Sequence, residues 1–63
     1  MQANSFMWST LPKAARCLLG REFGFEEQTI DCTLLNKISA TDFLVELPNG
    51  EKHEISTDFL IIR

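Results

Sequence analysis

Between residues 11 and 19 the apolar residues recur at i, i+3, i+4, i+7 and i+8, the spacing of one face of an α-helix. Ser9 or Thr10 suits the N-cap. Pro12 suits the first turn, and Gly20 suits the left-handed position after the last turn. The pattern therefore predicts an amphipathic helix whose apolar face consists of Leu11, Ala14, Ala15, Leu18 and Leu19.

After this segment the pattern changes to the alternation of half-buried strands. Residues 29–39 form one alternating run, residues 40–42 suit a turn, and residues 43–47 form a second run. Residues 56–58 suit another turn, and the uninterrupted apolar run from Phe59 to Ile62 predicts a short strand buried on both faces. The core positions predicted in the first two runs are Ile30, Cys32, Leu34, Ile38, Phe43, Val45 and Leu47.

The sequence Pro48-Asn49-Gly50 decides the register of one hairpin. A two-residue Asn-Gly loop would place Val45 opposite Glu54 and mix the core with charge. A type I turn followed by Gly50 in a left-handed bulge position avoids this. We therefore predict the second register, which pairs Phe43 with Ile55, Val45 with His53 and Glu46 with Lys52.

Together these elements predict a single α+β domain over residues 1–63, with one N-terminal amphipathic helix followed by a three- to four-stranded antiparallel sheet. Residues 42–62, DFLVELPNGEKHEISTDFLII, contain a strand, a hairpin with a glycine turn, and a one-turn link into a short strand. In this order they resemble the last three strands of an SH3-like or tudor-type small β-barrel. The resemblance implies a closed barrel. One helix packed across an open three- or four-stranded sheet fits the sequence equally well. The aromatic cage of some tudor-like barrels is not expected, because the chain has no Tyr and its one Trp precedes the helix.

The charge is distributed unevenly along the chain. The net charge is −3, yet residues 1–21 carry Lys13, Arg16 and Arg21 and no acid. A basic helix docked on an acidic sheet, or two copies packed head to tail, would explain this asymmetry. The three cations are also the candidate contacts to a nucleic acid or an acidic partner, although the net acidity disfavours broad phosphate contact.

The cysteines and the histidine favour structural roles over chemical ones. Cys17 and Cys32 lack the close spacing of a zinc pair, and with His53 they supply three ligands at most. His53 is predicted to face inward beside Val45 and to reach a neighbouring carboxylate or carbonyl. The start of the chain lacks the features of a signal peptide, so we expect a cytoplasmic protein with reduced, buried thiols.

The motifs of phosphate loops, dinucleotide sites and nucleophile elbows do not occur in the sequence. No apolar run reaches the length that crosses a bilayer. We therefore expect no enzymatic activity, no cofactor, no metal, no small-molecule substrate and no membrane contact.

Four aromatic residues flank the predicted helix and exceed what so small a core can bury. They predict a surface that binds another protein or a second copy as a homodimer. The predicted function is a non-catalytic protein–protein interaction module, such as a small adaptor, inhibitor or regulatory subunit. The alternatives are a nucleic-acid-binding regulator that uses the basic helix face, and an accessory subunit of a larger enzyme. The predicted interaction residues are Phe6, Trp8, Phe23 and Phe25.

Overall fold

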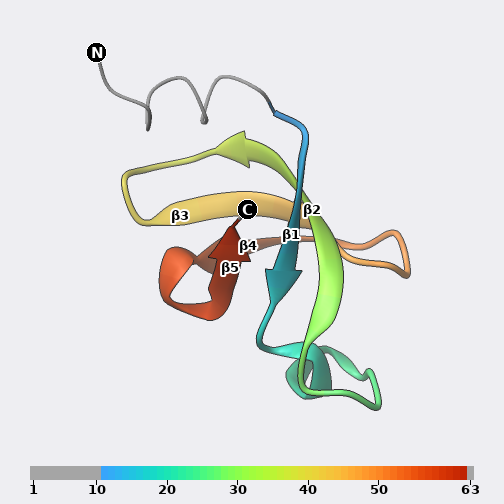
Figure 1. Ribbon diagram of the computed structural model, residues 1–63. Helices are drawn as coiled ribbons and strands as arrows, with labels where there is room; N and C mark the ends of the chain where they lie inside the picture. The colour runs from blue at the N-terminus through green and yellow to red at the C-terminus, as the bar shows by residue number, and fades with distance from the viewer. Residues whose placement is uncertain (1–10, 63) are drawn as a thin grey trace.

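The chain forms one curled antiparallel sheet, which the computed structural model describes over residues 11–62. The order of the strands across the sheet is β4-β3-β2-β1-β5, and every neighbouring pair is antiparallel. The sheet curls into a half-barrel, with β4 and β5 as its two end strands (Figure 1). The strands are β1 (Lys13–Cys17), β2 (Ile30–Lys37), β3 (Asp42–Glu46), β4 (Lys52–Ser56) and β5 (Leu60–Ile62).

The predicted α+β class is wrong, because the segment expected to be a helix is strand β1. Its residues pair with β2 on one side and with β5 on the other. In the part of the chain that the structure describes, the only helical segments are two 3₁₀ turns, η1 (Gly20–Phe23) and η2 (Thr57–Phe59). The fold is therefore all-β.

The apolar residues of this segment fit a period of two as well as the helical period. Ala15 and Cys17 are buried, and Leu11 and Leu19 pack against the same core. Leu18 belongs only to the helical set, and its side chain is exposed. Pairing with two neighbouring strands satisfies the backbone of β1 and overrides its local helix propensity.

Gly20 does not occupy the left-handed position predicted for it after a helix. The glycines with positive φ are Gly24 and Gly50, whereas Gly20 begins η1 and is buried. Its N–H donates to the carbonyl oxygen of Gln28 at 2.7 Å, which brings the chain before β2 against the end of β1. Gly20 therefore permits a close approach of two backbone segments.

The predicted β3–β4 register is confirmed. Phe43 pairs with Ile55, Val45 with His53 and Glu46 with Lys52. Gly50 has a φ of 92° and donates its N–H to the carbonyl oxygen of Leu47 at 2.9 Å. The turn chemistry thus determines which residues of β3 and β4 face the core.

The core lies on the concave face of the sheet, and it confirms the inward positions predicted in residues 29–47 except one. The exception is Ile38, which is 46% exposed. The register of β2 against β3 shifts between Leu34 and Asn36, so Leu35 is an extra residue that interrupts the alternation. The buried core residues are Ala15, Cys17, Ile30, Cys32, Leu34, Phe43, Val45, Leu47, Ile55 and Leu60.

Candidate protein-interaction site

Three exposed large apolar residues occur where the end of β1 adjoins η2 and β5. Leu18, Phe59 and Ile61 are 36%, 44% and 47% exposed, and we call them the β1–β5 strip. The N–H of Leu18 donates to the carbonyl oxygen of Phe59 at 2.8 Å, which continues the β1–β5 ladder beyond its last bridge. The prediction that residues 59–62 are buried on both faces is wrong, because only Leu60 is buried.

β5 is an end strand of the sheet and borders this site. Within residues 11–62 it pairs with β1 alone (Figure 1). The residues of β5, Leu60–Ile62, carry no charge. At its start the edge is already occupied, because the N–H of Leu60 donates to the carbonyl oxygen of Thr57 at the end of η2.

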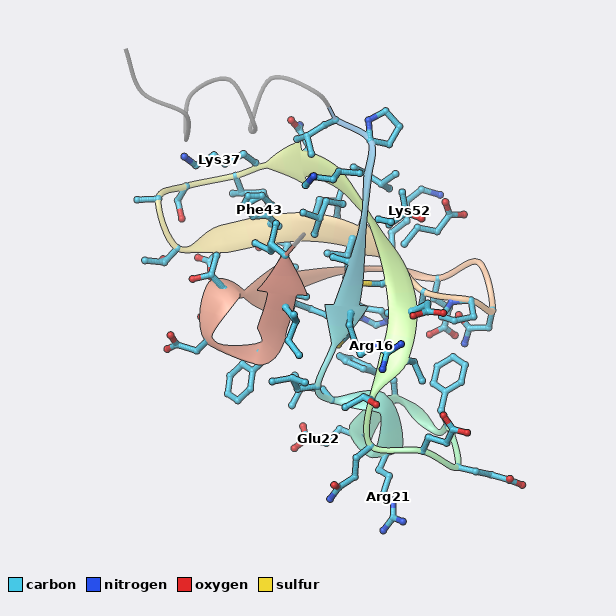
Figure 2. All side chains as sticks on the ribbon, in the orientation of Figure 1. Arg16, Arg21, Glu22, Lys37, Phe43 and Lys52 are labelled. Carbon is cyan, nitrogen blue, oxygen red and sulfur yellow. The ribbon has the colours of Figure 1, made fainter. Side chains whose placement is uncertain are left out.

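Arg16 borders the strip, because it pairs with Ile61 and lies two residues before Leu18 on the same face of β1. Its Nη2 donates to Oδ1 of Asp31 at 3.3 Å, and both side chains are substantially exposed. Figure 2 shows Arg16 beside strand β1, on the side of β2. Its Nε is buried, and no acceptor for it lies among the described residues.

The structure separates the three predicted cationic contacts. Lys13 and Arg16 are three residues apart on a strand and thus project from opposite faces of the sheet. Arg21 lies in η1, where its Nε donates to the carbonyl oxygen of Glu26 at 3.3 Å. The predicted basic helix face does not exist, because its segment is a strand.

Of the four predicted aromatic contacts, two lie in the described part of the chain. Phe23 and Phe25 are partly buried and pack against the core. The ring centroid of Phe23 lies 4.6 Å from that of His53, whose Nε2 is 3.1 Å from Oε1 of Glu51. The prediction that His53 reaches a neighbouring carboxylate is confirmed. Phe6 and Trp8 lie outside the described residues.

The sequence interpretation missed Leu18, Phe59 and Ile61 as surface residues. The helical spacing predicts Leu18 in a helix core, and the apolar run of residues 59–62 predicts a strand covered on both faces. One signal was available in the sequence. Leu18 is out of phase with the alternation of Ala15, Cys17 and Leu19, which is the alternation that the strand follows.

A second surface feature is an open hollow of about 630 Å³ over β1, β2 and β3. The polar side chains of its lining include Asp31, Thr33 and Glu46, and Ala14 and Gly50 contribute small residues. Within residues 11–62, no group of three His, Cys, Asp or Glu side chains could hold a metal ion. The lining thus presents the carboxylates of Asp31 and Glu46, of which that of Asp31 pairs with Arg16.

The described residues form no helix long and apolar enough to cross a membrane.

The two cysteines are free and buried, which confirms the prediction of small core residues. Ala15 pairs with Cys32 and Cys17 pairs with Ile30, so both thiols lie on the inner face of adjacent strands. Burial, the neighbouring Cys17 and the charge of Asp31 raise the pKa of Cys32 from 9.0 to about 11. A thiol that remains protonated is a poor nucleophile and a poor metal ligand.

Raising the pH from 9 to 11 is expected to destabilise the protein through Cys32. The native state retains the thiol proton at pH values where the unfolded chain has lost it, since the pKa is about 11 in the fold and 9.0 ordinarily. The stabilisation is complete below about pH 9 and is lost as the pH rises through about 11. At about 1.4 kcal/mol per pKa unit, the free energy of unfolding falls by up to about 3 kcal/mol.

Urea unfolding at pH 8 and at pH 10.5 measures this loss. The control is Cys32→Ala, which is less stable at both pH values because of its cavity but lacks the contribution of the thiol. If the free energy of unfolding of Cys32→Ala falls between the two pH values as much as that of the original protein, groups other than Cys32 cause the decrease.

Comparison with known proteins provides no relative: no family model matches the chain, and no curated protein and no solved structure matches it. The β1–β5 strip and the adjoining Arg16 are therefore the features of this chain that bear on its function.

Proposed function

We propose that this chain is a non-catalytic protein-interaction module and that the β1–β5 strip is its binding surface. The observation that carries the proposal is the exposure of Leu18, Phe59 and Ile61 where the end of β1 adjoins η2 and β5. Large apolar side chains exposed close together on a small protein are typical of surfaces that bind another polypeptide. An arginine at the margin supports this, because Arg and aromatic residues are enriched at binding hot spots.

For the finer class of the fold, we propose an SH3-like small barrel. The order of β3, the Gly50 hairpin, β4, η2 and β5 supports the resemblance of residues 42–62 to such barrels. This fold hosts many functions, so the exposed surface and not the fold indicates the binding role.

Substituting Ile61 or Phe59 with serine is expected to reduce capture of the partner about tenfold or more, because each side chain would fill a pocket at the centre of the interface. The measurement is quantitative pull-down from a lysate of the source cells with the original chain and each variant as bait. The matched control is Ile38→Ser, because Ile38 is 46% exposed and Ile61 is 47% exposed.

All three variants alter exposed positions and should leave the circular dichroism spectrum unchanged. If Ile38→Ser and Ile61→Ser retain the same proteins as the original chain, the strip is not the binding surface.

A further inference from the structure

We infer that Asn49 is a site of spontaneous deamidation and that the folded β3–β4 hairpin slows this modification. Asn49 and Gly50 lie at the tip of the hairpin, and the residues from Pro48 to Lys52 are all exposed. This site is independent of the β1–β5 strip, because the turn joins β3 to β4 and shares no residue with the strip.

Deamidation needs an asparagine that is followed by an unhindered backbone amide. The backbone nitrogen of Gly50 attacks Cγ of Asn49, and a C–N bond forms. The Cγ–Nδ2 bond breaks, the Gly50 amide proton passes to the leaving nitrogen, and ammonia is released. The product is a cyclic succinimide. Water then opens the ring at either of its two carbonyl groups and gives aspartate or isoaspartate at position 49.

Gly50 is the residue that favours this attack. It has no Cβ to crowd its own nitrogen, and a Cβ built at this position meets no heavy atom within 4 Å. The exposed Asn36 provides the contrast. It is followed by Lys37, whose side chain hinders the attacking nitrogen, and it pairs with Leu44 inside β2.

Two hydrogen bonds hold the reacting groups in the folded turn. The N–H of Gly50 donates to the carbonyl oxygen of Leu47 at 2.9 Å, and its nitrogen cannot attack while this proton is held. Oδ1 of Asn49 accepts from the N–H of Glu51 at 3.0 Å, which fixes the side chain. The reaction therefore requires the turn to open. Exposed turns open locally at a low free-energy cost, so the fold slows the reaction without stopping it.

The two products change the hairpin in different ways. Aspartate adds one negative charge to a chain of net charge −3, beside the hollow that Pro48 and Gly50 help to line. Isoaspartate carries the main chain through the side-chain carbons, which inserts an additional carbon atom before Gly50. This insertion disrupts the hydrogen bond of Gly50 with Leu47 and the turn that determines the β3–β4 register.

The test is incubation of the purified chain for several days at mildly alkaline pH, followed by trypsin digestion and mass spectrometry. Cleavage after Arg21, Lys37 and Lys52 separates the two asparagines into residues 22–37 and residues 38–52. The fragment 38–52 should gain the mass difference between an amide and a carboxyl group, about tenfold or more faster than the fragment 22–37. The same incubation in guanidinium chloride should raise the rate at Asn49 about tenfold, because no turn then holds the Gly50 N–H.

Two variants test the assignment. Asn49→Gln is the control, since ring closure from the longer side chain is much slower and the fragment 38–52 should keep its mass. Gly50→Ala in guanidinium chloride should slow the reaction about tenfold, because a Cβ crowds the attacking nitrogen while the folded turn and its strain are absent.

Each result decides one part of the inference. Equal rates in the two fragments, or a mass gain that persists in Asn49→Gln, would overturn Asn49 as the modified residue. Equal rates with and without guanidinium chloride would overturn the protection by the hairpin. An unchanged rate in Gly50→Ala would overturn attack by the nitrogen of residue 50.

Discussion

Replacing Gly20 with alanine is expected to unfold most of the protein. An added Cβ would overlap the carbonyl oxygen of Glu27, and it would approach Cγ2 of Ile30 at 3.0 Å and the carbonyl oxygen of Gln28 at 3.1 Å. These are backbone atoms and a core side chain that cannot easily move, because the N–H of Gly20 donates to Gln28. Overpacking of this kind costs about 3 kcal/mol, a large part of the stability of a domain of this size.

Urea unfolding followed by circular dichroism measures the loss. Gly24→Ala and Gly50→Ala are the controls, because a Cβ at either position meets open space. Their φ angles of 91° and 92° still disfavour alanine, by about 1 kcal/mol. If Gly20→Ala is no less stable than these two variants, the contact between the two backbone segments relaxes at little cost.

Replacing Phe43 with alanine is expected to be at least as damaging. Phe43 is one of the largest fully buried side chains, and it lies on β3 opposite Ile55. Removing a buried phenylalanine side chain costs about 3–5 kcal/mol, since the surrounding core collapses only partly into the cavity. Thermal and urea unfolding should show a chain that is largely unfolded without denaturant, whereas Phe43→Leu should remain folded with a loss of about 1 kcal/mol.

Phe59→Ala is the matched control, because it removes the same atoms from a side chain that is 44% exposed. Its expected loss is below about 1 kcal/mol, since most of that surface is already in contact with water. Equal losses for Phe43→Ala and Phe59→Ala would mean that Phe59 contributes to the core as much as Phe43.

The parts of the fold that the sequence predicts correctly depend on local chemistry. The β3–β4 register follows from a single turn, where Gly50 alone can take the left-handed conformation at no steric cost. The inward faces of β2 and β3 follow from alternation over short distances. Each of these features needs only residues that are close in the chain.

The errors arise where distant segments decide the structure. Residues 11–19 satisfy both a helical and a strand period, and the choice depends on pairing with β2 and β5. Ile38 is exposed and not buried as predicted, because a bulge shifts the register of β2 against β3. No residue type in β2 predicts that bulge. The exposure of Phe59 and Ile61 depends on the position of β5 at the end of the sheet, which the sequence of β5 alone does not reveal.

The pairing of β1 with β5 also has a consequence for the order of folding. Ala15 pairs with Ile62, so this contact joins two segments that are separated by almost the whole described chain. Closing such a loop costs more conformational entropy than forming the β3–β4 hairpin, and we expect it to occur late. Leu18, Phe59 and Ile61 come together only at this junction. An incompletely folded chain therefore lacks the proposed binding surface, and the ability to bind develops only when folding is complete.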